Sequence, residues 1–303
     1  MDKFTILRDH FGHTRYRSGQ LEVIDAILAR QDVLGIMPTG AGKSICYQVP
    51  ALLLDGVTIV VSPLISLMKD QVNALEQAGI PAAFLNSSLS QEEYRDVMAR
   101  TRAGEYKILY VAPERLLTDS FLALTRSLEI SMVTVDEAHC ISQWGQDFRP
   151  SYLRIVRFIE WLPVRPVVSA FTATATATVR DDIVVSLGLI EPLRITTGFD
   201  RENLRFEVRK PRHKPTALAD YVRANREKAG IVYCTTRKTV EEVCEGLSAR
   251  GFAATRYHAG LSEAERRANQ DDFLYDRKRV MVATNAFGMG IDKSDVSYVI
   301  HYN

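Results

Sequence analysis

Residues 33–44 read Val33-Leu34-Gly35-Ile36-Met37-Pro38-Thr39-Gly40-Ala41-Gly42-Lys43-Ser44 and indicate an α/β fold. The first four residues form a short apolar run typical of a buried strand, and an apolar helical pattern opens after Ser44. Gly40 and Gly42 therefore lie at a turn from strand to helix. Because glycine has no Cβ atom, backbone N–H groups there can wrap around an anion, and the amino end of the helix dipole favours negative charge. The pattern predicts a phosphate-binding turn.

Two side chains at the end of this turn suit a magnesium nucleotide. Lys43 can reach the β- and γ-phosphates, and the Ser44 hydroxyl can ligate Mg²⁺. The phosphate-loop pattern G-x-x-x-x-G-K-[ST] has glycine where this chain has Met37, so an ordinary glycine turn with a surface lysine is the alternative. The residues expected around the phosphates are Met37, Pro38, Thr39, Gly40, Ala41, Gly42, Lys43 and Ser44.

Two adjacent carboxylates follow a second strand-like run. Residues 130–135 are mostly apolar and end at Asp136 and Glu137. A buried parallel strand would place both carboxylates at its carboxyl end, the edge where open α/β sheets bind ligands and where the glycine turn also lies. Asp136 can hold Mg²⁺, and Glu137 can orient and deprotonate an attacking water. Together with Lys43, we predict this pair to be the catalytic set of a nucleoside-triphosphate hydrolase.

Length and composition bound the remaining possibilities. A chain of 303 residues suggests about two domains. The net charge of +1 supplies no global basic field, so a polyanion would need a local groove. The four cysteines lack C-x-x-C spacing and are expected to be reduced and mostly buried. No apolar run approaches the ~18 residues of a membrane span and no signal-peptide profile is present, so we expect an intracellular protein.

Strand-like runs alternate with helical ones, which predicts parallel sheets covered by helices on both faces. The first series is residues 57–62, 82–85, 107–112, 132–136 and 167–172, and the second is 203–208, 231–235, 253–258, 279–284 and 296–301. Gly188, Pro192 and Gly198 punctuate the pattern between them. Two successive α/β domains, residues 1–197 and 198–303, are the simplest interpretation.

Two strand ends carry groups that suit a phosphodiester backbone. Ser62 and Pro63 begin one predicted helix, and Thr236 and Arg237 begin another. Backbone N–H groups at helix starts bind anions, and hydroxyl and guanidinium groups add hydrogen bonds to phosphate. Each alone is an ordinary helix cap, but one on each domain indicates a nucleic-acid strand held at two points.

In order and spacing, these segments resemble the motifs of superfamily 2 helicases, and within that superfamily the RecQ DNA helicases. The resemblance covers nearly the whole chain: motif I at residues 37–44, Ia at 61–64, Ib at 111–115, II at 136–139, III at 171–175, IV at 232–237 and V at 283–292. It implies two tandem RecA-like domains and the use of ATP with Mg²⁺. It also implies that Ser62, Thr236, Arg237 and Thr284 contact DNA and that Asp292 contacts the ribose.

Residues 11–20 narrow the resemblance to RecQ, because they are similar to the family's motif 0. The resemblance implies that Arg17 and Gln20 read the adenine edge, and an amide can pair with N6 and N7 of adenine at once, which excludes guanine. His13 stands where the family often has a tyrosine that stacks on the base. We therefore expect His13, Arg17 and Gln20 to hold the base of ATP.

Residues 140–150 resemble the RecQ aromatic-rich loop, which senses single-stranded DNA directly after motif II. Trp144 and Phe148 offer aromatic faces on which bases can stack, and Arg149 offers charge or stacking. Packing in a core is the alternative for Trp144. The resemblance implies a monomer that moves 3′ to 5′ on single-stranded and partly duplex DNA. It would be cytoplasmic and nucleoid-associated in a bacterium and nuclear in a eukaryote.

The chain ends at Asn303, before the position where the family has motif VI with its arginine finger. Arginine fingers contribute on the order of 10³–10⁵ in kcat, so we expect this chain to bind nucleotide and hydrolyse it slowly. We also expect an incomplete second domain in a truncated form of a longer protein, and no helix covering residues 296–301.

Three alternative functions remain open at this stage. An RNA helicase of the same superfamily would share the nucleotide residues, and the aromatic-rich loop is the feature against it. A nucleotide-gated DNA-binding module without efficient turnover is favoured by the missing arginine finger. A metabolic phosphate-loop kinase is remote, because no segment resembles a lid over a small substrate.

Overall fold

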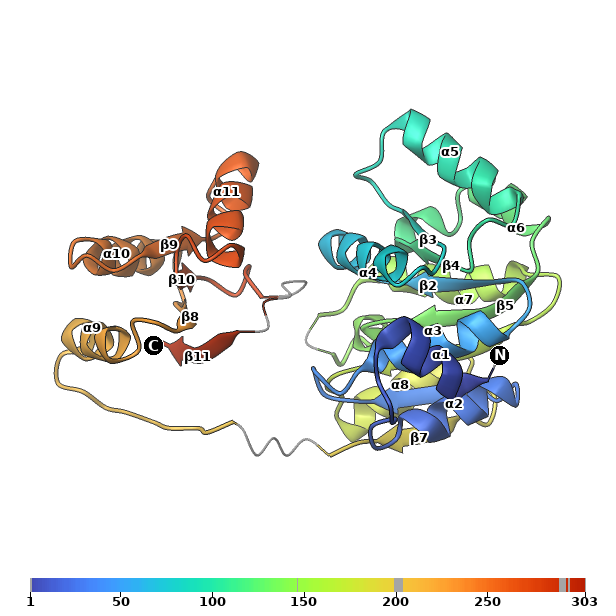
Figure 1. Cartoon of the computed structure of the whole chain (residues 1–303), viewed down its shortest axis with the longest axis horizontal. Helices are drawn as coiled ribbons and strands as arrows, with labels where there is room; N and C mark the ends of the chain where they lie inside the picture. The colour runs from blue at the N-terminus through green and yellow to red at the C-terminus, as the bar shows by residue number, and fades with distance from the viewer. Residues whose placement is uncertain (1, 146, 199–203, 289–292, 294, 303) are drawn as a thin grey trace. The chain divides into compact units, whose positions relative to one another are not determined.

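The computed structural model describes residues 2–145, 147–198, 204–288, 293 and 295–302. The chain divides into two compact units, Met1–Arg201 and Glu202–Asn303. Each unit has its own sheet, and every strand pairing in both sheets is parallel (Figure 1). The predicted α/β class is confirmed. No helix in the described part of the chain is long and apolar enough to cross a membrane.

The first unit contains a seven-stranded sheet in the order β3-β4-β2-β5-β6-β1-β7. Its strands are β1 (Val33–Ile36), β2 (Val57–Val61), β3 (Ala82–Leu85), β4 (Ile108–Val111), β5 (Ile130–Val135), β6 (Val167–Thr172) and β7 (Leu193–Thr196). β1, β2, β4 and β6 are buried along their whole length, because both faces of a parallel sheet are covered. This explains why these strands read as continuous apolar runs in the sequence.

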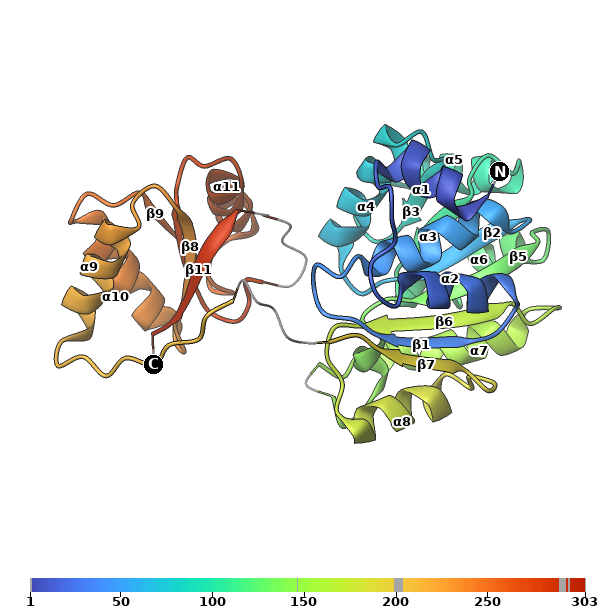
Figure 2. The same cartoon turned by 60° about the horizontal axis from the view of Figure 1, so that its bottom comes forward.

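Helices cover both faces of this sheet (Figures 1 and 2). They are α1 (Lys3–Phe11), α2 (Gln20–Leu28), α3 (Lys43–Leu53), α4 (Ile65–Gln77), α5 (Gln91–Arg102), α6 (Asp119–Thr125), α7 (Leu153–Trp161) and α8 (Ala177–Ser186), with the 3-10 turns η1 (Pro113–Arg115), η2 (Ala138–Ile141) and η3 (Pro150–Tyr152). Ile59 and Val60 are neighbours in β2 yet belong to opposite cores, because successive side chains of a strand point to opposite faces. Ile59 shares its core with α6 and α7, and Val60 shares its core with α2 and α3.

β7 lies in the stretch that the sequence analysis treated as the join between domains. It pairs with β1 in register, with Val33 opposite Leu193. Leu193 and Ile195 pack against the core, whereas Arg194 and Thr196 face solvent. The sequence pattern does not predict this strand, because it has only two apolar residues and because the glycine and proline residues around it are typical of a loop.

The second unit contains a four-stranded sheet in the order β11-β8-β10-β9. Its strands are β8 (Ala229–Tyr233), β9 (Ala254–Tyr257), β10 (Val280–Ala283) and β11 (Val296–His301), and its helices are α9 (Lys214–Ala224), α10 (Arg237–Ser248) and α11 (Glu263–Leu274). α9 and α10 share a core with Val232, and α11 packs on the other face through Phe273, beside Ile231. β11 is an edge strand whose Val299 is half exposed.

The predicted strand at residues 203–208 is wrong for its described part. Residues 204–208 have no regular secondary structure, and Phe206 and Val208 are 93% and 87% exposed. Alternating apolar residues suit a strand only where a neighbouring edge supplies hydrogen bonds and a core covers one face. Neither is present for this segment among the described residues.

Candidate nucleotide and nucleic-acid site

The glycine turn has the backbone that a phosphate cradle requires. Gly40 and Gly42 have φ angles of 84° and 78°, in the left-handed region that favours glycine. A Cβ atom at Gly42 would also lie 2.5 Å from Nε2 of Gln20. Met37 does not have a positive φ, and its buried side chain approaches Cys46, with 3.7 Å between the two sulfur atoms. Position 37 is therefore a core position, which explains why methionine replaces the glycine of the general pattern.

Lys43 begins α3 directly after the turn, and its charge acts on both carboxylates. Its Nζ atom is 3.3 Å from the carbonyl oxygen of Met37. Its positive charge opposes the rise in the pKa of Asp136 and contributes to the lowered pKa of Glu137. β1 and β5 are separated by β6 alone, so their carboxyl ends lie roughly 10 Å apart at one edge of the sheet. The structure thus places Lys43, Asp136 and Glu137 at the same edge of the sheet.

Asp136 is buried at the carboxyl end of β5, with 8% of its surface exposed. Its amide donates to the carbonyl of Val61 at 2.9 Å, and its Oδ1 atom accepts from the amide of Glu137 at 3.0 Å. Burial and the neighbouring Glu137 raise the pKa of Asp136 to about 6, against the opposing effect of Lys43. Burial makes the negative charge of this carboxylate energetically unfavourable. A divalent cation bound to Asp136 would compensate that charge.

Glu137 has an unusual left-handed backbone, with φ 47° and ψ 47°, which re-aims its side chain after the strand. Its Oε2 atom lies 3.3 Å from Nδ1 of His139, and the same nitrogen is 2.8 Å from the hydroxyl of Thr172 at the end of β6. Burial raises the pKa of Glu137, but His139 and Lys43 outweigh it and the pKa is lowered overall. Glu137 is therefore ionised at neutral pH, as a base must be.

The segment predicted to read adenine lies against the glycine turn. His13, Arg17 and Gln20 line a cavity of about 680 Å³ together with Gly42. Its volume lies within the ~300–1,000 Å³ of small-molecule sites. The Gln20 amide accepts from the backbone N–H of Arg17 at 2.8 Å and donates to the carbonyls of Ala41 and Gly42, each at 3.0 Å. Pairing of Gln20 with a base would require exchange of these bonds.

The aromatic-rich loop presents one fully available ring. Trp144 is 75% exposed, which excludes the alternative that it packs in a core, whereas Phe148 is partly buried. Nε and Nη2 of Arg149 donate to Oδ2 of Asp147 at 3.1 and 3.0 Å, and Nη1 donates to the carbonyl of Pro63 at 3.0 Å. Arg149 thus ties the loop to the start of α4, and contact with a nucleic acid would require it to change partners.

A possible metal cluster lies at the base of this loop and was not predicted from the sequence. One ligand atom each of His139, Cys140 and Asp147 lies within 4.8 Å of the others. Burial raises the pKa of the Cys140 thiol to about 12, and Asp147 is paired with Arg149. A protonated thiol and an occupied carboxylate make a poor metal site. Cys140 instead contacts both His139 of motif II and Asp147 of the loop, each at 3.8 Å.

The residues predicted to contact DNA differ in exposure. Ser62 is buried, and its hydroxyl has no partner among the described residues, so it is not available to a strand in this conformation. Thr236 caps α10 through the amide of Thr239 at 3.1 Å, and Arg237 beside it is exposed. Thr284 follows β10 at the same carboxyl edge of the second sheet and is buried. Asp292 lies outside the described residues.

Comparison of the sequence with known protein families shows which family has these motifs. The sequence profile of the DEAD/DEAH box helicases matches residues 17–182, and that of the helicase conserved C-terminal domain matches residues 213–303. The chain belongs to the DEAD/DEAH box helicase family. The chain is 49% identical to the ATP-dependent DNA helicase RecQ of Bacillus subtilis over 98% of the present chain, and 45% identical to that of Haemophilus influenzae over 99% of the present chain. The resemblance to RecQ helicases is confirmed.

Two solved helicases show the same fold. Mycobacterium smegmatis Lhr bound to single-stranded DNA and AMP-PNP superposes with a TM-score of 0.74 at 20% identity, covering 99% of this chain and 44% of Lhr. Saccharomyces cerevisiae Dbp5 bound to RNA and ADP BeF3 gives 0.72 at 18% identity, covering 100% and 78%. Both units are thus of the RecA-like type. The chain spans about half the length of the two RecQ proteins, 50% and 48%.

Proposed function

We propose that this chain is the motor core of a RecQ-type helicase that couples ATP hydrolysis to 3′-to-5′ movement on single-stranded DNA and to duplex unwinding. The observation that carries the proposal is the convergence of Lys43 with Asp136 and Glu137 at one sheet edge, directly followed by a loop that exposes Trp144. The lysine and the two carboxylates suit Mg-ATP, and the exposed ring of Trp144 suits a stacked base. Their adjacency in the chain supplies a direct route for coupling.

Each residue of the nucleotide site has a distinct role in this proposal. Backbone N–H groups of the turn at 40–42 and the ammonium of Lys43 bind the phosphates. Ser44 and Asp136 would hold Mg²⁺, which when bound neutralises charge on the phosphate oxygens. Glu137 accepts a proton from the attacking water, and His139 keeps the Glu137 carboxylate ionised.

Coupling to DNA would run through the loop after motif II. His139 contacts both Glu137 and Thr172, and Cys140 lies beside it at the base of the loop. A base stacked on Trp144 would shift the loop, and the movement would reach Glu137 through His139. The loop thus links occupancy by DNA to the position of the base that activates water.

The test is ATP hydrolysis by the wild-type chain and Glu137→Gln, with single-stranded DNA or RNA of equal length. Glu137→Gln should retain nucleotide affinity and lose at least about 10²-fold in kcat, because general bases contribute ~10²–10⁴. Glu129→Gln, an exposed glutamate before the other end of β5, is the matched control and should leave turnover unchanged.

Each alternative function gives a different outcome. Equal stimulation by RNA and DNA would contradict the assignment to DNA. Nucleotide-dependent DNA binding with no measurable wild-type turnover would instead support a nucleotide-gated binding module. A fully active Glu137→Gln variant would remove the role given to Glu137.

A further inference from the structure

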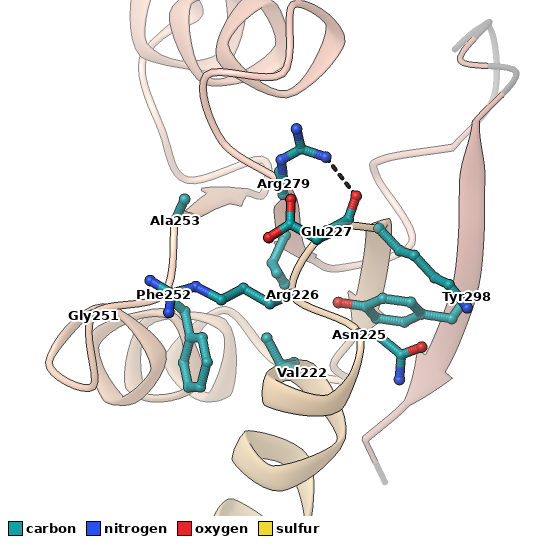
Figure 3. A pocket seen from close by; sticks show the side chains of 11 residues that line it. Val222, Asn225, Arg226, Glu227, Gly251, Phe252, Ala253, Arg279 and Tyr298 are labelled. Atoms are coloured by element: carbon teal, nitrogen blue, oxygen red, sulfur yellow. Dashed lines mark hydrogen bonds between the residues drawn. The ribbon is translucent and has the colours of Figure 1, made fainter.

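The second unit has a cavity at the amino-terminal edge of its sheet. The cavity measures about 190 Å³ and is lined by the turn before β8, the turn before β9 and the first residues of β10, with Tyr298 of β11 as one wall (Figure 3). Thr236 and Thr284 follow the carboxyl ends of β8 and β10, at the opposite edge. Because a strand of four or five residues spans about 15 Å, this cavity lies apart from the residues predicted to contact DNA.

Three basic side chains line this cavity. Arg226 and Lys228 are exposed, and their side chains make no hydrogen bond or ion pair within the described ranges. Nη1 of Arg279 donates to the carbonyl oxygen of Glu227 at 2.6 Å, as the dashed line in Figure 3 marks. Glu227 supplies the one carboxylate of the lining. The excess of positive charge is therefore two, and it favours a dianionic group.

Part of the remaining lining is apolar, and it includes two aromatic rings, of which the Phe252 ring also has Arg223 over it. Val222 and Tyr298 are buried, and Phe252 is partly buried. The Tyr298 ring lies directly against Gly230, where a Cβ atom would come within 2.1 Å of it, so the wall depends on glycine at that position. Stacked and edge contacts with such rings favour a flat partner.

The Tyr298 hydroxyl is an unsatisfied polar group beside this cavity. It is buried without a hydrogen-bond partner among the described residues, and burial raises its pKa to about 12, so it remains a donor. A buried donor without a partner costs free energy, which a ligand oxygen would recover once the Tyr298 side chain turned its hydroxyl toward the cavity. In Figure 3 the ring extends from β11 across the lining.

We propose that this cavity binds a phosphate monoester carried on a single flat ring. The phosphate would pair with Arg226, Lys228 and Arg279, and its charge of nearly −2 would match the excess positive charge of the lining. The ring would lie against Phe252 and Tyr298. The volume corresponds to about six water molecules and falls below the ~300 Å³ of drug-sized sites, which limits the occupant to one ring and one phosphate. A nucleoside monophosphate, which carries a sugar as well as a base, is too large for this volume.

The test is titration of phenyl phosphate into the full chain, followed by ³¹P NMR. We expect saturable binding with a Kd on the order of 1 mM, with inorganic phosphate and phenol each about tenfold weaker or more. Arg226→Gln combined with Lys228→Gln should weaken binding of phenyl phosphate about tenfold or more, because two charge-assisted contacts are lost. Tyr298→Phe keeps the ring and should weaken it by about threefold or more.

Two control variants locate the binding. Lys210→Gln removes an exposed positive charge outside the cavity and should leave the affinity unchanged. Lys43→Ala should also leave it unchanged, which separates this cavity from the nucleotide site of the first unit. Thymidine 5′-monophosphate, which adds a sugar to the base and the phosphate, exceeds this volume and should compete more weakly than phenyl phosphate.

Three results would overturn the proposal. They are an absence of saturation up to about ten times the expected Kd, an unchanged affinity in the Arg226 and Lys228 double variant, and loss of binding in Lys43→Ala. Equal affinity for inorganic phosphate would remove the role of the ring walls and would also count against it.

Discussion

Asp136 is a single residue of the nucleotide site whose buried charge lowers the stability of the nucleotide-free chain. The pKa of its carboxyl group is about 6 in the folded chain, above the ordinary 3.8. A raised pKa means that the folded state holds the proton more tightly than the unfolded state. This contribution to stability is fully present below pH 3.8 and is lost as pH rises through 6. Above that pH the ionised carboxylate destabilises the nucleotide-free chain.

Asp136→Asn should therefore stabilise the nucleotide-free chain at pH 8, by at most about 3 kcal/mol. The asparagine Oδ1 can still accept from the amide of Glu137, so only the charge is removed. Urea unfolding at pH 8 and pH 5 measures the effect, and the difference from wild type should shrink at pH 5. The exposed Asp55→Asn should change stability little at either pH. A variant less stable than wild type at pH 8 would contradict the burial argument.

The aromatic-rich loop carries a prediction at the scale of an element. Trp144 is its most exposed ring, and stacking of a base on an aromatic side chain is worth ~1–3 kcal/mol. Trp144→Ala should weaken binding of single-stranded DNA about 5- to 100-fold and remove most DNA stimulation of ATP hydrolysis, while hydrolysis without DNA stays unchanged.

Fluorescence anisotropy with a labelled oligonucleotide and a coupled ATPase assay measure these two effects. The matched control is Trp161→Ala in α7, the other tryptophan of the chain, which is 44% exposed and lies over Arg126. Its loss should leave both measurements unchanged. A Trp144→Ala variant with normal DNA stimulation would show that another residue senses the strand.

Edge strands and the segments that connect elements are harder to predict from sequence than the position of the nucleotide-site residues. Lys43 and Asp136 could be placed together from sequence, because parallel strands bring their carboxyl ends to one edge. β7 was missed because an edge strand buries only alternate residues, and residues 204–208 were assigned a strand because an alternating pattern does not reveal whether a partner edge exists. Residue types also do not reveal that the Gln20 amide is already bonded to the glycine turn, since that contact depends on packing.

At the scale of the whole molecule, each unit has its own hydrophobic cores. Phe273 is fully buried in the core between α11 and the second sheet, beside Phe287. All described residues assigned to phosphates, magnesium and base lie in the first unit, Met1–Arg201. The first unit should therefore keep its nucleotide site when the second unit is destabilised.

Phe273→Ala tests this separation. It should destabilise the second unit by about 3–5 kcal/mol, the usual result of removing a buried phenyl ring. Nucleotide affinity should stay within about threefold of wild type, because sites without shared partners contribute nearly independently. DNA-stimulated hydrolysis should fall, since Thr236 and Arg237 lie in the destabilised unit. Hydrogen exchange with mass spectrometry can follow each unit separately, and Phe206→Ala, which removes a 93% exposed ring from the same unit, is the control. Parallel loss of nucleotide affinity in Phe273→Ala would mean that the second unit helps to form the nucleotide site.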